Sequence, residues 1–158
     1  TLVKHPNQRV DLAIPEMLAA MRDLPEEQDP AKDYPFILMA GERRSYNATQ
    51  IIRNPAWRKI DHSGALRMHP EDAALLGLAA GGIATCRSSN GQLDVIVELD
   101  DGLRRGTATL PRGYGQRFQG SAPIGPAINR LTGSAHCEPL TKTPFHKYVP
   151  VHIAPAAA

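Results

Sequence analysis

IATCRSSNGQLDVIVEL, residues 83–99, decides the fold class. It holds two strand-like runs on either side of Asn90-Gly91, a dipeptide typical of a tight β-hairpin turn. In the second run alternate residues are apolar, namely Leu93, Val95, Val97 and Leu99. A period of two is that of a strand with one face in the core. The stretch therefore predicts a pair of antiparallel strands.

The residues just before the hairpin predict a short helix. In RMHPEDAALLGL, residues 67–78, Pro70 suits the first helical position, and two carboxylates follow it at the positive end of the helix dipole. Gly77 provides the stop. The helix has about two turns. His69 fits the position of its N-cap, so we exclude His69 from the candidate site residues.

Further strands are predicted on both sides of this centre. FILMA, residues 36–40, is a short apolar run that predicts a buried strand ended by Gly41. GTATLP, residues 106–111, predicts another strand, and a glycine-rich loop follows at 112–126. YVPVHI, residues 148–153, alternates, but Pro150 predicts an edge or irregular strand. The sum is a mainly β protein, a small barrel with one or two short helices.

The composition is that of one soluble globular domain. The chain has 158 residues, 42% hydrophobic and 22% charged, with 14 prolines and 13 glycines that favour short elements joined by turns. The net charge of +2 argues against a nucleic-acid-binding polyelectrolyte. Cys86 and Cys137 have no zinc or iron–sulfur spacing. No run is long and apolar enough to span a bilayer. We expect a cytoplasmic protein without nucleic-acid or membrane partners.

The chain divides into three parts. Residues 1–34 form an N-terminal helical segment and a linker that lead into the domain. LAIPEMLAAMRDL, residues 12–24, predicts a helix with an apolar stripe, and the polar, proline-rich PEEQDPAKDYP predicts the linker. Residues 35–154 form the domain, and residues 155–158 an alanine-rich tail. Whether the chain is a fragment or a separate subunit, and its oligomeric state, stay open.

Four stretches, in this order, resemble the C-terminal molybdopterin dinucleotide-binding domain of molybdenum and tungsten oxidoreductases, the family of formate dehydrogenases, nitrate reductases and dimethyl sulfoxide reductases. They are FILMAGERRSYNAT, LRMHPEDAALLGLAAGG, GTATLPRGYG and INRLTGSAHCEPLTKTPFHKYVPVHI. Together they cover residues 36–153, and the second is the most specific. Residues 9–24 resemble the segment that often precedes the domain. One departure is GE at residues 41–42, where the family usually has GR; here the arginines follow at 43 and 44.

The resemblance implies a fold, a cofactor and partners. The family fold is a six-stranded double-psi β-barrel. The implied cofactor is molybdopterin guanine dinucleotide, over which the C-terminal segment wraps. The implied partners are the remaining domains of the parent molybdoenzyme, which hold the molybdenum or tungsten and the metal ligand. This chain is then not catalytic on its own. The substrate of the parent enzyme and the choice of metal cannot be read from it.

Candidate cofactor-binding residues follow from the chemistry of a dinucleotide. Its pyrophosphate takes backbone N–H groups and cations, and its ring edges take groups that both donate and accept. Gly41 allows close backbone approach, arginines supply charge, and asparagines suit ring edges. His146 and Lys147 match a pair that lies next to the cofactor in the family. The candidates are Gly41, Arg43, Arg44, Ser45, Asn47, Thr49, Arg112, Asn129, Thr132, His146 and Lys147.

Two other readings stay open at this point. One is a free-standing double-psi barrel that acts as a nucleotide- or protein-binding adaptor. The other is a complete enzyme, but the histidines are scattered and no acid–base or nucleophile constellation has a recognisable spacing. Trp57 is interpreted as a packing residue.

Overall fold

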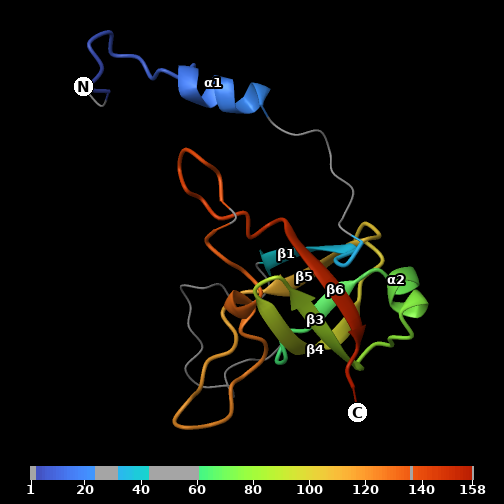
Figure 1. The fold of residues 1–158 in the computed structure, drawn as a ribbon. Helices are drawn as coiled ribbons and strands as arrows, with labels where there is room; N and C mark the ends of the chain where they lie inside the picture. The colour runs from blue at the N-terminus through green and yellow to red at the C-terminus, as the bar shows by residue number, and fades with distance from the viewer. Residues whose placement is uncertain (1–2, 24–31, 43–60, 136, 158) are drawn as a thin grey trace.

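The structure, a computed structural model, describes residues 3–23, 32–42, 61–135 and 137–157 (Figure 1). Its elements in chain order are α1 (Pro15–Arg22), β1 (Phe36–Glu42), β2 (Leu66–Met68), α2 (Pro70–Leu75), β3 (Ile83–Ser88), β4 (Gly91–Leu99), β5 (Thr107–Pro111), the 3-10 helix η2 (Ile128–Arg130) and β6 (Val149–Pro155).

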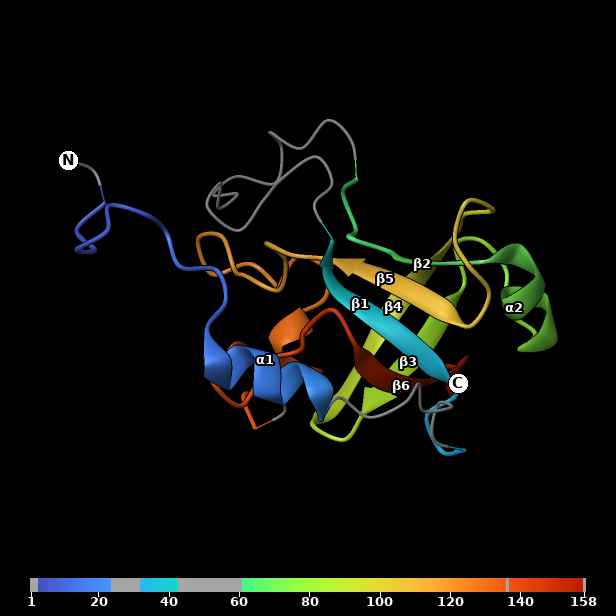
Figure 2. The same ribbon diagram turned by 90° about the horizontal axis from the view of Figure 1, so that it is seen from above.

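The six strands close into one barrel, in the order β1-β5-β2-β4-β3-β6 (Figures 1 and 2). Strands far apart in sequence pair in parallel, β1 with β5 and β2 with β4, while the other neighbours are antiparallel. The predicted mainly β fold with a six-stranded barrel is confirmed. The two crossed parallel pairs agree with the double-psi arrangement that the resemblance implies.

The predicted hairpin forms between β3 and β4, with its turn one residue earlier than expected. Ser88 pairs with Gly91, so Ser89 and Asn90 are the two loop residues. The Ser88 hydroxyl accepts a hydrogen bond from the Asn90 amide at 3.1 Å, which holds the chain in this register. Val97 is the last inward residue of β4, since Leu99 at the strand end is exposed.

The motif before the hairpin forms both a strand and a helix. β2 was not predicted, because three residues are too few to show a period. In α2, His69 is the N-cap, and its Nδ1 accepts from the Glu71 amide at 3.1 Å, as expected. Gly77 follows the helix with φ of +69°, which confirms the predicted stop.

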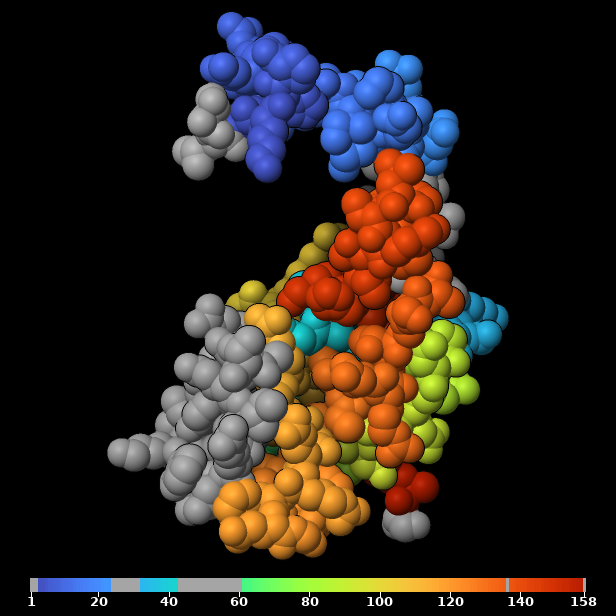
Figure 3. Space-filling model, turned by 90° about the vertical axis from the view of Figure 1, so that its left-hand side faces the viewer, coloured from blue at the N-terminus to red at the C-terminus, as the bar shows by residue number. Residues whose placement is uncertain are grey.

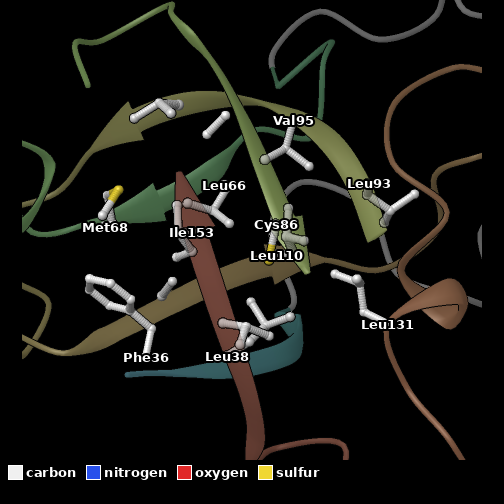
Figure 4. Close-up of a cluster of buried hydrophobic side chains, with 14 of the residues drawn as sticks. Phe36, Leu38, Leu66, Met68, Cys86, Leu93, Val95, Leu110, Leu131 and Ile153 are labelled. Atoms are coloured by element: carbon white, nitrogen blue, oxygen red, sulfur yellow. The ribbon is translucent and has the colours of Figure 1, made fainter. Parts of the chain in front are cut away.

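The core is a single cluster of inward-facing side chains from all six strands (Figure 4). Leu38, Leu66, Leu110 and Ile153 are almost completely buried. Leu131 joins them from the segment after η2, outside the sheet, and lies near Leu93 (Figure 4). Burying one leucine contributes roughly 1.5–3 kcal/mol. This burial therefore anchors the segment that follows η2 to the end of the barrel.

Two predictions about individual strands are wrong. FILMA is buried on one face only, and β1 continues past Gly41 to Glu42, because Gly41 (φ +80°) forms a bulge that shifts the register against β5. β6 is not an edge strand. Its first residues pair with β1 and its later ones with β3, and Pro150 lies in the part where only the β1 pairing is present. Pro150 has no backbone N–H, and this is tolerated there because β3 does not pair with that part of β6.

α1 forms with Pro15 in its first turn, as predicted, but buries none of its residues. Its apolar side chains Met17, Leu18 and Met21 are all exposed. In Figure 1 the helix stands apart from the barrel. The described helices include none that is both long and apolar enough to cross a membrane.

Candidate functional site

The bulge at the end of β1 forms one wall of the candidate site. Because Gly41 leaves the regular ladder, its carbonyl is available to accept from Lys147 Nζ at 3.4 Å. The Ala40 amide donates to the His146 carbonyl at 2.9 Å, and the Arg112 amide donates to the Glu42 carbonyl at 3.3 Å. The end of β1 is thus tied both to the C-terminal segment and to the loop after β5.

The segment from η2 to Ser134 forms the facing wall, and the hairpin turn braces it. The carbonyl of buried Leu131 accepts from the Ser88 hydroxyl at 2.8 Å and from Asn90 Nδ2 at 3.5 Å. A Cβ added at Gly133 would lie 2.5 Å from Asn90 Oδ1. The Asn90 side chain would have to shift to admit a Cβ at Gly133, so the two loops, distant in sequence, pack closely against each other here.

These walls enclose an open cleft of about 440 Å³. It is lined by Ala40, Gly41, Arg112, Ile128, Asn129, Thr132, Gly133, Ser134, Pro144 and His146. Figure 3 looks toward this side of the molecule, and atoms of β1 (cyan) are visible in a hollow between the orange and red segments. The floor is apolar, because Ala40 and Ile128 are buried members of the core cluster. The rim is polar and exposed.

The charge of the cleft favours an anion. Arg112 is an exposed cation on the rim, and Lys147 lies beside Gly41. None of the described residues that line the cleft is acidic. Within the described ranges, the side chains of Arg112, Asn129 and Thr132 take no part in any recorded protein hydrogen bond. These three side chains can therefore turn toward a ligand.

The ring of His146 can add a hydrogen-bond acceptor to the cleft. Its Nδ1 lies 3.0 Å from the Pro144 carbonyl, and a carbonyl can only accept, so Nδ1 carries the hydrogen. In the neutral ring Nε2 is then the acceptor. A heterocycle with N–H groups at its edge is a suitable partner for such a nitrogen.

Glu42, the departure from the family pattern, is engaged elsewhere. Its Oε1 lies 3.3 Å from Arg67 Nη1, and its Oε2 accepts from the Thr109 hydroxyl at 2.7 Å. Arg67 also binds Glu98 at 2.8 Å. The Glu42 carboxylate is therefore balanced by a network that links β1 to β2, β4 and β5, and it does not line the cleft.

The structure brings together five of the predicted site residues, namely Gly41, Arg112, Asn129, Thr132 and His146. A sixth, Lys147, contacts the same wall through Gly41. Arg43, Arg44, Ser45, Asn47 and Thr49 lie outside the described residues, as does Trp57. Gly41 and residues of the segment 129–147 thus line one cleft, while residues 43–49 of the predicted site loop lie outside the described residues.

Sequence reasoning did not name several residues of the walls. Gly133, Ser134 and Pro144 line the cleft within the motif-bearing segment, where only its Asn, Thr, His and Lys had been picked for their side chains. Ser89 and Asn90 line a smaller neighbouring cavity. Asn90 was assigned to the hairpin turn alone, and Ser89 to the strand-like run before it. Within the described ranges, no three His, Cys, Asp or Glu side chains are grouped so as to hold a metal ion.

Comparison with known proteins identifies the family of the chain. Residues 36–150 match the molybdopterin dinucleotide-binding domain family, which is well over half of the chain. The chain is also similar to acetylene hydratase of Syntrophotalea acetylenica, with 32% identity over 91 residues, or 56% of this chain and 12% of that protein.

A solved structure, acetylene hydratase from Pelobacter acetylenicus, has the same fold. It aligns with a TM-score of 0.65 and 20% identity, over 79% of this chain and 19% of that one. The chain thus spans less than a fifth of the length of each of these relatives. The family match also confirms the predicted cofactor, molybdopterin guanine dinucleotide. From its barrel, its cleft and this match, the chain belongs to the molybdopterin dinucleotide-binding domain family.

Proposed function

We propose that the cleft between the β1 bulge and the segment 128–147 binds the pyrophosphate and an adjoining ring of molybdopterin guanine dinucleotide. The observation that carries this proposal is the meeting of Gly41, Arg112, Asn129 and His146 in one cleft without a described acidic lining residue. A cofactor of this kind carries the hard chemistry itself, while the protein binds and orients it.

The donor set of the cleft fits the cofactor. Arg112 can make charge-assisted, two-pronged hydrogen bonds to phosphate oxygens. The bulge at Gly41 lets a phosphate approach the backbone, and Lys147 adds a second positive charge nearby. Asn129 offers one donor and one acceptor function to a ring edge. The apolar floor of Ala40 and Ile128 suits the flat face of a ring.

We infer the wider role of the chain from the small share of its relatives' length that it covers. The chain spans 12% of the acetylene hydratase that it resembles and 19% of the solved one. We therefore place it as the C-terminal domain of a larger molybdenum- or tungsten-dependent oxidoreductase, with residues 35–154 as the cofactor-binding domain. Other domains hold the metal, and this domain performs no redox chemistry alone. Its setting in the cytoplasm stays a prediction from the sequence.

A free-standing barrel that acts as a nucleotide- or protein-binding adaptor is the second candidate. Its support is the closed barrel itself, which needs no neighbouring domain to complete its sheet. The family match and the cation on the rim of the cleft favour the dinucleotide, so this candidate ranks second.

Equilibrium dialysis of the 158-residue chain against molybdopterin guanine dinucleotide tests the proposal. Loss of a charge-assisted hydrogen bond costs about 1.5–3 kcal/mol, so Arg112→Ala should weaken binding by roughly 10- to 100-fold. Asn129→Ala and Lys147→Ala should weaken it by smaller factors. Arg117→Ala, an exposed arginine outside the cleft, is the matched control. Equal affinities for all four variants and the unaltered chain would remove the basis of the proposal.

A further inference from the structure

A row of polar side chains runs across four strands of the barrel. Thr109 on β5 lies opposite Arg67 on β2, and Arg67 lies opposite Glu98 on β4. Arg67 Nε donates to Glu98 Oε1 at 2.8 Å. At the other end of the row, Glu42 on β1 accepts from the Thr109 hydroxyl at 2.7 Å and lies 3.3 Å from Arg67 Nη1. Side-chain contacts therefore join β1 to three other strands at Glu42.

The contacts of Glu42 are partly shielded from water. Thr109 is 4% exposed, and the side chains of Glu42 and Arg67 are 26% and 28% exposed. Hydrogen bonds to a charged group are stronger than neutral ones, and partial exclusion of water strengthens them further. The last residue of β1 is therefore held by its side chain as well as by its backbone.

The two cations described at the cleft, Arg112 and Lys147, both contact the backbone that Glu42 holds. The Arg112 amide donates to the Glu42 carbonyl at 3.3 Å, and Arg112 Cδ would lie 3.9 Å from a Cβ added at Gly41. Lys147 Nζ donates to the Gly41 carbonyl at 3.4 Å. Gly41 has no side chain that could fix its position in the bulge. The direction of its carbonyl therefore depends on the residues next to it.

We propose that Glu42 is a positioning residue for anion binding in the cleft. Its carboxylate fixes the bulge that presents Arg112 and Lys147 to a pyrophosphate group. This inference rests on the proposed function, because the anion is the pyrophosphate of the dinucleotide. Glu42 does not line the cleft, so it acts through Gly41 and Arg112.

Positioning and simple charge predict opposite effects of removing Glu42. A carboxylate near an anion site repels the anion, so the loss of its charge alone would strengthen anion binding or leave it unchanged. If the carboxylate holds the bulge in place, its loss weakens anion binding. The sign of the change in affinity therefore distinguishes the two effects.

Calorimetric titration of the 158-residue chain with inorganic pyrophosphate tests the proposal. Glu42→Ala should weaken binding by about five-fold or more, because the bulge loses its side-chain support. Glu42→Gln keeps an acceptor for Thr109 and should recover most of the affinity. Thr109→Val removes one hydrogen bond to Glu42 but no charge, and should weaken binding by a smaller factor. Circular dichroism confirms that each variant is folded at the temperature of the titration.

Glu98→Ala is the matched control. It removes a carboxylate from the same Arg67, as Glu42→Ala does, but from a strand that does not pair with β1. The two variants therefore lose the same charge from one network, and only Glu42→Ala releases the bulge. Glu98→Ala should bind pyrophosphate as tightly as the unaltered chain.

A double-mutant cycle separates positioning from a general loss of stability. In the Arg112→Ala background, Glu42→Ala should lose much of its effect on pyrophosphate binding, because one of the cations that it positions is absent. The backbone amide shifts of Gly41 and Arg112 in the chain without ligand give a second readout. They should change in Glu42→Ala and stay unchanged in Glu98→Ala.

The outcomes separate this inference from the proposed function. The role of Glu42 is overturned if Glu42→Ala binds pyrophosphate as tightly as the unaltered chain or more tightly, or if Glu98→Ala weakens binding equally. Full additivity with Arg112→Ala, or no recovery in Glu42→Gln, also overturns it. If Arg112→Ala weakens binding and Glu42→Ala does not, only the role of Glu42 fails. If Arg112→Ala has no effect, the cleft is not the anion site, and both proposals fail.

Discussion

Asp72→Ala should destabilise the barrel strongly, although Asp72 is far from the proposed site. The side chain of Asp72 is buried, its residue being 5% exposed, and it joins α2 to the turn before β5. Its Oδ2 accepts from the Gly106 amide at 2.7 Å, and its Oδ1 accepts from Arg105 Nε at 3.2 Å. Removal of the carboxylate leaves the half-buried Gly106 N–H without its partner.

The magnitude follows from these two contacts. A hydrogen bond to a charged group contributes about 1.5–3 kcal/mol, and the ion pair adds at most about 1 kcal/mol because the Arg105 side chain is 55% exposed. We expect the free energy of unfolding to fall by about 2–4 kcal/mol and the Tm by roughly 5–12 °C. Urea denaturation and thermal scans followed by circular dichroism measure both.

Glu71→Ala provides the control on the neighbouring residue. Glu71 pairs with the same Arg105 at 2.9 Å, but its side chain is 65% exposed, so its removal should cost no more than about 0.5 kcal/mol. The reasoning is refuted if the free energy of unfolding of Asp72→Ala lies within about 0.5 kcal/mol of that of the unaltered chain. It is also refuted if Asp72→Ala and Glu71→Ala lower the free energy of unfolding equally.

Three further predictions concern the rest of the molecule. Burial raises the pKa of the Cys86 thiol to about 12. DTNB at pH 8 should therefore modify half-exposed Cys137 and leave Cys86 intact until the chain unfolds. Reaction of both thiols in the native protein would contradict this. Hydrogen bonds from Thr141 lower the pKa of exposed Glu138 below its ordinary value of 4.5. The ionised carboxylate therefore stabilises the loop above pH 4.5, and this stabilisation is lost as the pH falls through the lowered pKa of the folded state. An NMR titration that follows the Thr141 amide checks this, and a transition at pH 4.5 or above would contradict it. Removal of residues 1–31 should change the Tm of the barrel by no more than about 2 °C because α1 buries nothing, and a larger loss would show that the helix packs on the barrel.

The parts of the fold that depend on local chemistry could be predicted from the sequence. The hairpin follows from an alternating run and a turn dipeptide, and α2 from its capping histidine, Pro70 and Gly77. The pairing of β1 with β5 could not be read in this way, because the two strands are separated by about half of the chain. Only the resemblance to a family implied how the strands cross.

The site shows the same division. Asn129, Thr132 and His146 were predicted because they stand in one recognisable segment, and Gly41 because it follows a strand. Asn90 was missed as a wall residue, since its contact with Gly133 exists only once the barrel has closed. The engagement of Glu42 by Arg67 likewise depends on strands that meet only in the closed barrel.

Mapping of backbone amide shifts on the ¹⁵N-labelled chain, with molybdopterin guanine dinucleotide added, tests the central claim most directly. We predict that the changes concentrate at Gly41, Arg112, Asn129 and Gly133, around the cleft. The separate cavity beside Leu75 and Arg105, on the α2 side of the barrel, should stay unaffected. Changes confined to that α2 side, with the cleft amides unmoved, would contradict the account.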